Sequence, residues 1–497
     1  MNRLYFLFSL LPVIPFSSLA WSDTASLQPS QAMPRQGLPA SSVVTIVSLN
    51  DRTIDLTLSD AIYLGLRDNR SIRSMYLDRI AQKFDLRVAE DRFTPKLMLS
   101  AGYISERNQD DRWRQGNITP TTTLLTPYGT RVSLGWAGSH TRSRDAGRSS
   151  NDGANISVIQ PLLRGAGKEI ATAPVRMARL NEQLNRLSLK LTVSLTVTRI
   201  ITAYRELLQA QEQVKIARES LARSRQLVGV NRAMIAAGRM AEFDIVQTEA
   251  DVASQELALE DAHNQLDATR LALLQLLALD LNTPVVASDD LQVHQVEVNT
   301  RQAFLQAEAS QPVWLAQLIT SEQAAIDLAV AGNNRLWDVS LVGGASQVHD
   351  RSEHGGTSRT WDNYIGVQVE IPVGDLSARK AEVQAQVNVK TSVLRQQEAR
   401  QQLERDVTNA VRDITTRWRQ YEIALRVRDL SRRKLEIERE KLTVGRSSNF
   451  QVLSFENDLR NAEYARLNAL ITYLNTQTQL DQTLGTTLQS WDITLND

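Results

Sequence analysis

The chain has 497 residues, in which 56 lysines and arginines balance 56 aspartates and glutamates, and it has no cysteine. The even charge provides no general attraction to nucleic acid, and the lack of thiols excludes disulfides, thiolate nucleophiles and cysteine-ligated zinc. The five histidines show no metal-ligand spacing such as His-x-x-x-His, so we expect no metal and no other cofactor. No nucleophile–base pair or phosphate-binding loop is recognisable, and we do not expect an enzyme.

The N-terminal segment predicts export from the cytoplasm. Residues 1–20 combine an early cation, Arg3, an apolar run and small residues around Leu19, which is typical of a secretory signal peptide cut after Ala20. Residues 21–52 are rich in Ser, Pro, Thr and Gln and predict a mobile leader. No cysteine follows the cut, which excludes a lipid anchor there, and no later stretch is apolar enough to predict a transmembrane helix.

Two long segments have the pattern of continuous helices. Residues of about 168–237 contain one glycine, Gly229, and one proline, Pro174, and residues of about 376–444 contain neither. Apolar residues recur in steps of three and four, as in Leu403, Val407, Val411, Ile414, Trp418, Tyr421 and Leu425. About 70 helical residues span roughly 100 Å, and a helix of that length needs neighbours along it, in a coiled coil or a helical tube.

Alternating segments precede both long helices. TRVSLGWA alternates apolar Val132, Leu134 and Trp136 with other residues, and YIGVQVEI does the same with Ile365, Val367, Val369 and Ile371. Such alternation is typical of a lipid-facing barrel with a wet interior and, equally, of a half-buried strand in a soluble sheet. The signal peptide and the long helices favour the barrel. One chain supplies at least four strands, too few to close around a channel, so closure would need several copies.

One phrase occurs twice: GRMAEFDIVQTE begins at Gly238, and GRSSNFQVLSFE begins at Gly445. Each glycine stands where one helical pattern stops, and a second pattern begins a few residues later. Because glycine just past a helix end readily adopts the left-handed conformation that terminates helices, both phrases predict a turn at the tip of a helical hairpin.

The duplication extends beyond the tips. Pro161 and Pro372 end the alternating segments and are 211 residues apart. The similar segments upstream, which begin at Phe84 and Ile326, are 242 residues apart. The first copy therefore has 31 extra residues between its upstream segment and its proline. We predict a first repeat at 53–285, with strands at about 97–162 and a tip turn at 238, and a linker at 286–299. The second repeat is predicted at 300–485, with strands at about 337–372 and a tip turn at 445, followed by a tail at 486–497.

These features together resemble the TolC-like family of outer membrane efflux proteins: the two repeats of strands and long hairpin, QPLLRGAG at residues 160–167, the pair Ile371–Pro372 and the two tip turns. The resemblance covers about residues 56–484. It implies an α+β membrane protein, a trimer whose twelve-stranded outer-membrane β-barrel continues into a long periplasmic α-helical barrel. It also implies an equatorial belt made of about residues 282–299 and the C-terminal end. The segment RVSLGWAGS at 131–139 indicates one hairpin more than the family minimum.

The resemblance also implies a function. The family's role is that of a passive trimeric duct in a tripartite export system of the Gram-negative outer membrane, carrying drugs, toxic compounds or secreted protein. The implied partners are two further copies of the chain, a periplasmic adaptor (membrane fusion) protein, an inner-membrane transporter of the resistance-nodulation-division or ABC type, and outer-membrane lipid, but no nucleic acid.

The same resemblance assigns roles to the turns. The second tip would lie on the inner hairpin that narrows the entrance, and its residues suit a wet constriction: Gly445, Arg446, Ser447, Asn449, Gln451 and Ser454. The first tip would face the adaptor with Gly238, Arg239, Phe243 and Asp244. Pro161 and Pro372 would make the strand-to-helix turns. The family's entrance aspartates are replaced here by Gln451 and Ser454, and Arg446 would need acidic partners, with Glu456 or the acids of a neighbouring chain as candidates.

Two other classes of protein fit less well. A trimeric coiled-coil structural protein or adhesin of the cell envelope would explain the long helices but not two returning hairpins in one chain. A periplasmic adaptor would show one hairpin with compact β domains rather than two equal copies.

Overall fold

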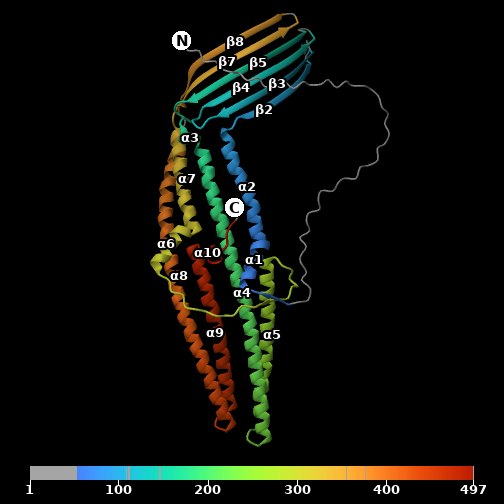
Figure 1. Cartoon of the computed structure of the whole chain (residues 1–497), viewed down its shortest axis with the longest axis vertical. Helices are drawn as coiled ribbons and strands as arrows, with labels where there is room; N and C mark the ends of the chain where they lie inside the picture. Colours follow the sequence, from blue (N-terminus) through green and yellow to red (C-terminus); the bar gives the residue numbers. More distant parts are fainter. Residues whose placement is uncertain are drawn as a thin grey trace, which may run out of the picture. The chain divides into compact units, whose positions relative to one another are not determined.

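The structure is a computed structural model that describes residues 53–107, 109, 112–144, 147–353, 355–374 and 376–495. The predicted signal peptide at 1–20 and leader at 21–52 lie outside the described residues, as do the last two residues of the predicted tail. The described chain has a helix-rich α+β fold in which one antiparallel sheet is connected to long helical hairpins (Figure 1).

The same order of elements occurs twice along the chain. The first repeat contains α1 (Leu58–Asp68), α2 (Arg70–Glu90), the 3-10 turn η1 (Asp91–Phe93), four strands, α3 (Lys168–Ala171), α4 (Ala173–Ala236) and α5 (Asp244–Leu277). The second contains α6 (Thr300–Ser310), α7 (Pro312–Asn334), two strands, α8 (Ser377–Thr443), α9 (Asn449–Leu484) and α10 (Thr487–Ser490). In each repeat two helices precede the strands, and a long helical hairpin follows them.

The main sheet has six strands in chain order: β2 (Lys96–Arg107), β3 (Arg112–Leu125), β4 (Arg131–Ser143), β5 (Arg148–Pro161), β7 (Asp338–Ser352) and β8 (Gly356–Glu370). All neighbours are antiparallel, and the pairing of β5 with β7 joins the two repeats. Twelve strands in a trimer would require four from each chain, so the six strands observed here correct that expectation. The extra residues of the first repeat supply the additional hairpin, which consists of β3 and β4. Because this hairpin starts and finishes at the same end of the sheet, β5 runs in the direction that it would have without the hairpin.

The long helices are held by continuous apolar stripes. Helix α4 has 64 residues and α8 has 67. The residues of α4 that are at most 1% exposed include Leu189, Val193, Val197, Ile200, Tyr204 and Leu207, in steps of three and four. Helix α8 buries Leu403, Val407, Val411 and Ile414, and Trp418 packs its ring 5.1 Å from that of Tyr473 on α9. Each fully buried side chain contributes about 1.5–3 kcal/mol. None of the helices in the described ranges is both long and apolar enough to cross a bilayer.

The repeated Gly-Arg phrase closes both hairpins with the same hydrogen bonds. At the first tip, Gly238 N–H donates to Ile235 O (2.9 Å) and Arg239 N–H to Met234 O (2.8 Å). At the second, Gly445 N–H donates to Leu442 O (3.0 Å) and Arg446 N–H to Lys441 O (2.8 Å). Both glycines have positive φ, 69° and 74°. This is the Schellman closure of a helix, and it explains why the same residues occur at both positions.

A small parallel sheet joins the two ends of the first repeat. Strand β1 (Ile54–Leu56) pairs with β6 (Val285–Ala287). Tyr204 of α4 donates its hydroxyl to Leu56 O (2.8 Å), and Tyr473 of α9 donates its hydroxyl to His294 O (2.8 Å). The predicted linker at 286–299 thus begins inside β6, a strand that the sequence analysis did not foresee.

Close backbone approach makes Gly485 a sensitive position. This residue ends α9 with φ of 73°, and an added Cβ would lie 2.6 Å from Ser310 O and 2.8 Å from Gln311 Cα. Gly445 also has positive φ, but nothing lies within 4 Å of an added Cβ. We expect Gly485→Ala to lower the free energy of unfolding by about 2–4 kcal/mol, because conformational strain and overpacking add, and Gly445→Ala by only about 1–2 kcal/mol. Guanidinium unfolding followed by helical circular dichroism measures both. Equal losses would show that the contact with the α6–α7 connection is not tight.

Candidate functional site

The strand register sorts the side chains of the sheet onto two faces. Directly opposed residues of antiparallel strands share a face, so Leu134, its partner Ile156 and the next partner Ala345 lie on the same side. We call this side the apolar face. Its exposed large apolar side chains are Leu97, Leu99, Tyr103, Ile118, Leu134, Trp136, Ile156, Val158, Leu341, Trp361, Ile365, Val367 and Val369. The predicted alternation in both repeats places its apolar residues here.

The opposite side of the sheet, which we call the polar face, carries mainly hydroxyl and amide side chains. They include Ser100, Asn117, Thr119, Thr121, Ser133, Asn155, Ser157, Ser346 and Gln368, with a few apolar exceptions such as Met98 and Ile104. An exposed apolar face of this extent is unusual for a monomeric soluble protein, whereas one lipid-facing and one water-facing surface would produce this distribution.

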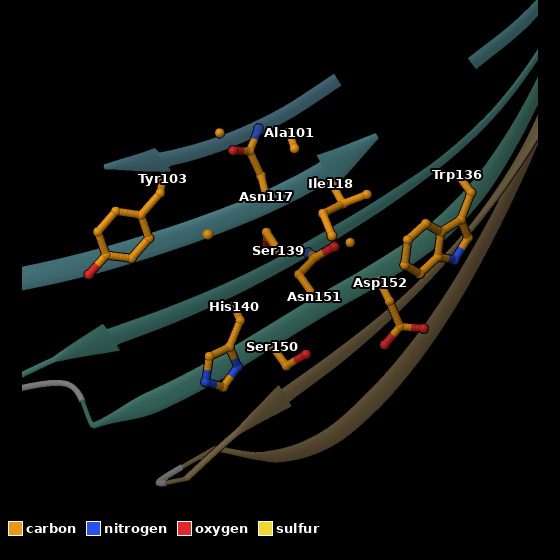
Figure 2. Close-up of a pocket in the computed structure, with 13 residues that line it drawn as sticks. Ala101, Tyr103, Asn117, Ile118, Trp136, Ser139, His140, Ser150, Asn151 and Asp152 are labelled. Atoms are coloured by element: carbon orange, nitrogen blue, oxygen red, sulfur yellow. The ribbon is translucent and has the colours of Figure 1, made fainter. Parts of the chain in front are cut away.

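A hollow of about 720 Å³ lies on the apolar face across β2 to β5. Figure 2 shows its side chains, among them Tyr103, Trp136, His140 and Asp152. Glycines on adjacent strands leave this room, and the ring of Trp136 covers Gly138, where an added Cβ would lie 2.5 Å from the indole. The hollow has apolar walls with a single histidine and a single carboxylate, and we find no catalytic arrangement in it.

The two helix tips are joined by buried polar side chains. Asn231 of α4 donates to Asn449 Oδ1 (2.9 Å) and Thr248 Oγ1 (3.3 Å), and Asn449 donates to Asp244 O (3.4 Å). Asn231, Thr248 and Asn449 are all less than 9% exposed. Asn449 was expected among the side chains of a wet constriction; instead it holds the first hairpin against the second.

The remaining predicted tip residues are more accessible, and the two tips differ in detail. At the second tip, Arg446 is exposed, Ser447 donates to Glu438 Oε1 (2.6 Å), and Ser448 Oγ accepts from Gln451 N–H (3.2 Å) as the N-cap of α9. Gln451 and Ser454 are half-buried.

At the first tip, Gly238 and Arg239 are exposed, Asp244 is half-buried, and Phe243 is 77% exposed. The second tip exposes Phe450 (66%) and Val444 (67%) as well. Both tips therefore combine exposed apolar side chains with polar ones.

A cluster of charged side chains lies between α4, α8 and α9, above the second tip. Glu456, only 3% exposed, is bonded by Arg223 and by Arg439 (3.0 Å), and Glu463 is bonded by Arg223 (3.4 Å) and Arg432 (3.3 Å). Burial of Arg223 opposes its charge, but the hydrogen bond with Glu456 and the charges of both carboxylates outweigh it and raise the pKa of Arg223. Glu456 was a candidate partner of Arg446. This assignment is wrong, because Arg223 and Arg439 bind it.

The strand-to-helix turns also differ. Pro161 is buried as the last residue of β5, in register with Ser340, and its ring lies against Gly129. Pro372 is exposed after the end of β8. In the phrase QPLLRGAG, Arg164 forms an ion pair with Asp338 (2.8 Å), and Gly165 N–H donates to Asn333 Oδ1 (2.7 Å). The phrase therefore anchors the end of the first repeat's strands to the start of the second repeat's strands.

Comparisons with known proteins agree with this geometry. Residues 61–279 match the model of a family described as outer membrane efflux protein, whereas no curated protein sequence matches the chain. Among solved structures, the outer membrane protein VceC of Vibrio cholerae is similar with a TM-score of 0.65 and 14% identity, over 86% of this chain and 96% of that one. The CmeC outer membrane channel of Campylobacter jejuni is similar with a TM-score of 0.66 and 15% identity, over 93% and 95%.

The open state of the MtrE outer membrane channel of Neisseria gonorrhoeae is similar with a TM-score of 0.66 and 15% identity, over 87% of this chain and 89% of that one. Identities this low show a common fold, and the family model matches residues 61–279. The outer membrane efflux protein model thus matches less than half of the chain, and the solved outer-membrane proteins show that most of the chain shares their fold.

Proposed function

We propose that three copies of the chain form the passive outer-membrane duct of a tripartite export system, receiving substrate from a periplasmic adaptor and an inner-membrane transporter. The observation that carries the proposal is the sheet, which has one exposed apolar face and two unpaired edges. The family match supports an efflux role, and the long helical hairpins support a periplasmic tunnel.

The edges favour a closed ring of copies. Strands β2 and β8 have no partner on their outer sides among the described residues, and β2 is exposed along its whole length. With six antiparallel strands the two edge strands run in opposite directions, so β8 of one copy can pair with β2 of the next and continue the same pattern. Head-to-tail pairing that closes gives a ring. In a trimer the six strands of each chain would make a barrel of eighteen rather than twelve.

The two faces then have natural environments. The apolar face would meet the lipid, and the polar face would line a water-filled lumen, because strands of membrane barrels alternate in this way. The strands have 12 to 15 residues, which is more than the roughly 9–11 tilted residues that a bilayer requires. The excess would extend beyond the membrane on the side of the hairpin turns between strands.

Assembly can be tested on the purified protein. We expect the detergent-solubilised chain to have the mass of a trimer and to conduct ions in planar lipid bilayers. Mass measurement and single-channel recording check the two parts. A stable monomer that produces no current would contradict the proposal, because one open sheet cannot enclose a pore.

The tips would have different roles in the duct. We assign the second tip, with Gln451 and Ser454 on the inner helix pair, to the entrance, and the first tip, with exposed Phe243, to the adaptor. The chain has no cysteine, so single cysteines can be introduced without background. A bulky thiol reagent on Gln451→Cys should lower the conductance of the trimer several-fold. The same reagent on Ala241→Cys should leave conductance unchanged and weaken adaptor binding. The opposite pattern would reverse the assignment of inner and outer hairpins.

A further inference from the structure

An arginine stands near the outer end of every strand of the sheet, and all six lie on the apolar face. We call them the arginine row: Arg107, Arg114, Arg142, Arg148, Arg351 and Arg359. The outer end is the one farthest from the long helices, where the β2–β3, β4–β5 and β7–β8 turns lie. Among the acidic residues near this end, Glu106, Asp350 and Asp362 lie on the polar face, and Asp152 lies on the apolar face. The six arginines therefore outnumber the acidic residues on the apolar face at this end.

The arginines are not neutralised by the described part of the chain. All six are exposed, and none of them forms an ion pair there. Arg114 lies directly opposite Arg142, and Arg142 directly opposite Arg148, so three like charges lie in register on neighbouring strands. Such an arrangement is unfavourable unless an anion lies between the side chains. Guanidinium groups bind phosphate through paired hydrogen bonds, which makes phosphate a suitable anion.

A second feature marks the same place. A hollow of about 320 Å³ lies beside the row, lined by Arg148 and Arg351 together with His140, Ser150, Thr357 and Glu353. The hydroxyls add neutral donors to the two cations. Glu353 is the one acid lining it and accepts a hydrogen bond from the backbone N–H of Arg148 (2.9 Å). A tetrahedral anion placed here would meet donors from β5, β7 and β8.

The position of the row relative to the apolar band indicates that the anion belongs to a lipid. On the apolar face, each arginine is followed toward the helices by one to four small, polar or aromatic residues and then by the exposed apolar side chains. Tyr103, Trp136 and Trp361 lie at this boundary, where aromatic side chains of membrane barrels meet the interface. An acyl chain could therefore lie on the apolar band while its phosphate meets the arginines. A free anion would gain nothing from the band.

The row also follows the geometry of tilted strands. Arg351 lies opposite Ser150, which is two residues nearer the helices than Arg148. Arg359 lies opposite His349, which is two residues nearer the helices than Arg351. Strands of a barrel tilt by about 35–45°, so residues at one membrane height shift in register from strand to strand. A shift in a single direction from β5 to β8 is what a level belt on a tilted sheet requires.

We propose that the arginine row is a binding site for the phosphate groups of outer-leaflet lipid, so that each protomer holds anionic lipid at the rim of its apolar face. This rests on the proposed function in one respect, that the apolar face meets the membrane. Six arginines per chain repeated around a closed ring would form a continuous cationic belt at the level of the lipid headgroups.

The test uses the purified trimer in an uncharged detergent. It is titrated with a bisphosphorylated hexa-acyl glycolipid, and bound lipid is counted by native mass spectrometry, which also reports whether each variant is trimeric. The wild type should retain the glycolipid, and Arg114→Gln/Arg142→Gln/Arg148→Gln should bind it roughly a hundredfold more weakly. The matched single variants are Arg142→Gln and Arg131→Gln, since Arg131 lies on the same strand but on the polar face at the helix end. Arg142→Gln should lose affinity for the glycolipid, whereas Arg131→Gln should keep it.

Two results would overturn the proposal. One is equal retention of glycolipid by wild type, Arg142→Gln and the triple variant. The other is displacement of the glycolipid by millimolar inorganic phosphate, which would indicate a site for free phosphate. Loss of the trimer or of conductance in the wild type would instead refute the proposed function, so the two failures are distinguishable. If the triple variant does not assemble, the comparison of Arg142→Gln with Arg131→Gln decides whether the arginine row binds the glycolipid.

Discussion

Replacing Val367 by arginine should prevent the protein from entering the outer membrane, whereas replacing its neighbour Gln368 in the same way should not. Val367 is 63% exposed on the apolar face, between Ile365 and Val369 on its strand and opposite Leu341 on the next. Gln368 points to the polar face. An arginine on the lipid side costs about 2–4 kcal/mol near the middle of a bilayer. Three copies in a trimer would triple that cost.

Membrane insertion can be measured by fractionating cells and by counting heat-resistant trimers in the outer membrane. We expect Val367→Arg to reduce the inserted trimer at least tenfold and Gln368→Arg to remain close to wild type. The two variants carry the same added charge one residue apart, so differences in expression or net charge cannot account for a contrast. Equal levels of insertion would mean that the apolar face does not meet lipid.

Removing Arg223 should destabilise the helical region more than the loss of an exposed ion pair does. Arg223→Met would leave Glu456 and Glu463, which are 3% and 6% exposed, with one cation each. A buried charge left without any partner costs about 3–5 kcal/mol, and this range is the upper limit here because Arg439 and Arg432 remain. The loss should appear as a lower midpoint in guanidinium unfolding followed by helical circular dichroism, at one fixed protein concentration because assembly contributes to stability.

Arg225 supplies the matched control. It lies two residues further along α4 and forms an ion pair with Glu256 at 2.7 Å, but its side chain is 61% exposed and that of Glu256 49%. Arg225→Met should change stability by about 0–1 kcal/mol. Adding Glu456→Gln to Arg223→Met should recover part of the loss, since one of the two buried carboxylates that lost Arg223 is then neutral. A similar loss for Arg223→Met and Arg225→Met would show that the cluster carries no special stability.

Much of the architecture was predictable because it depends on local patterns. Glycine at a helix end predicted both tips, and the closures at Gly238 and Gly445 have the expected left-handed conformation. Steps of three and four predicted the buried stripe of α8, where Leu403, Val407, Val411 and Ile414 are all buried. Alternation predicted which residues of the strands share a face. These signals are short in range, so they can be read from the sequence without knowing how the chain folds back.

The features that the sequence did not predict depend on contacts between segments that are far apart in the chain. Glu249 and Glu456 occupy the same place in the repeated phrase, yet Glu249 forms an exposed ion pair with Arg232 and Glu456 is buried under Arg223, because only the second lies between neighbouring helices. Asn449 was expected to face water because it is polar, but it bonds with Asn231, 218 positions away in the chain. The pairing of β1 with β6 involves three residues on each side, too few to leave an alternating pattern.

The pairing of β1 with β6 bears on how the two repeats came to follow one another in the chain. Leu56 of β1, Val285 and Ala287 of β6, and Leu488 of α10 belong to one buried cluster, with Leu495 packed against it. The beginning of the first repeat, its end, and the end of the second repeat therefore meet at one place. A circularly permuted gene that joined residue 495 to residue 53 and opened the chain within 288–299 would keep the helices and strands of both repeats intact. Tandem duplication can leave this kind of molecule, in which the first unit starts and finishes at the place where the second unit finishes.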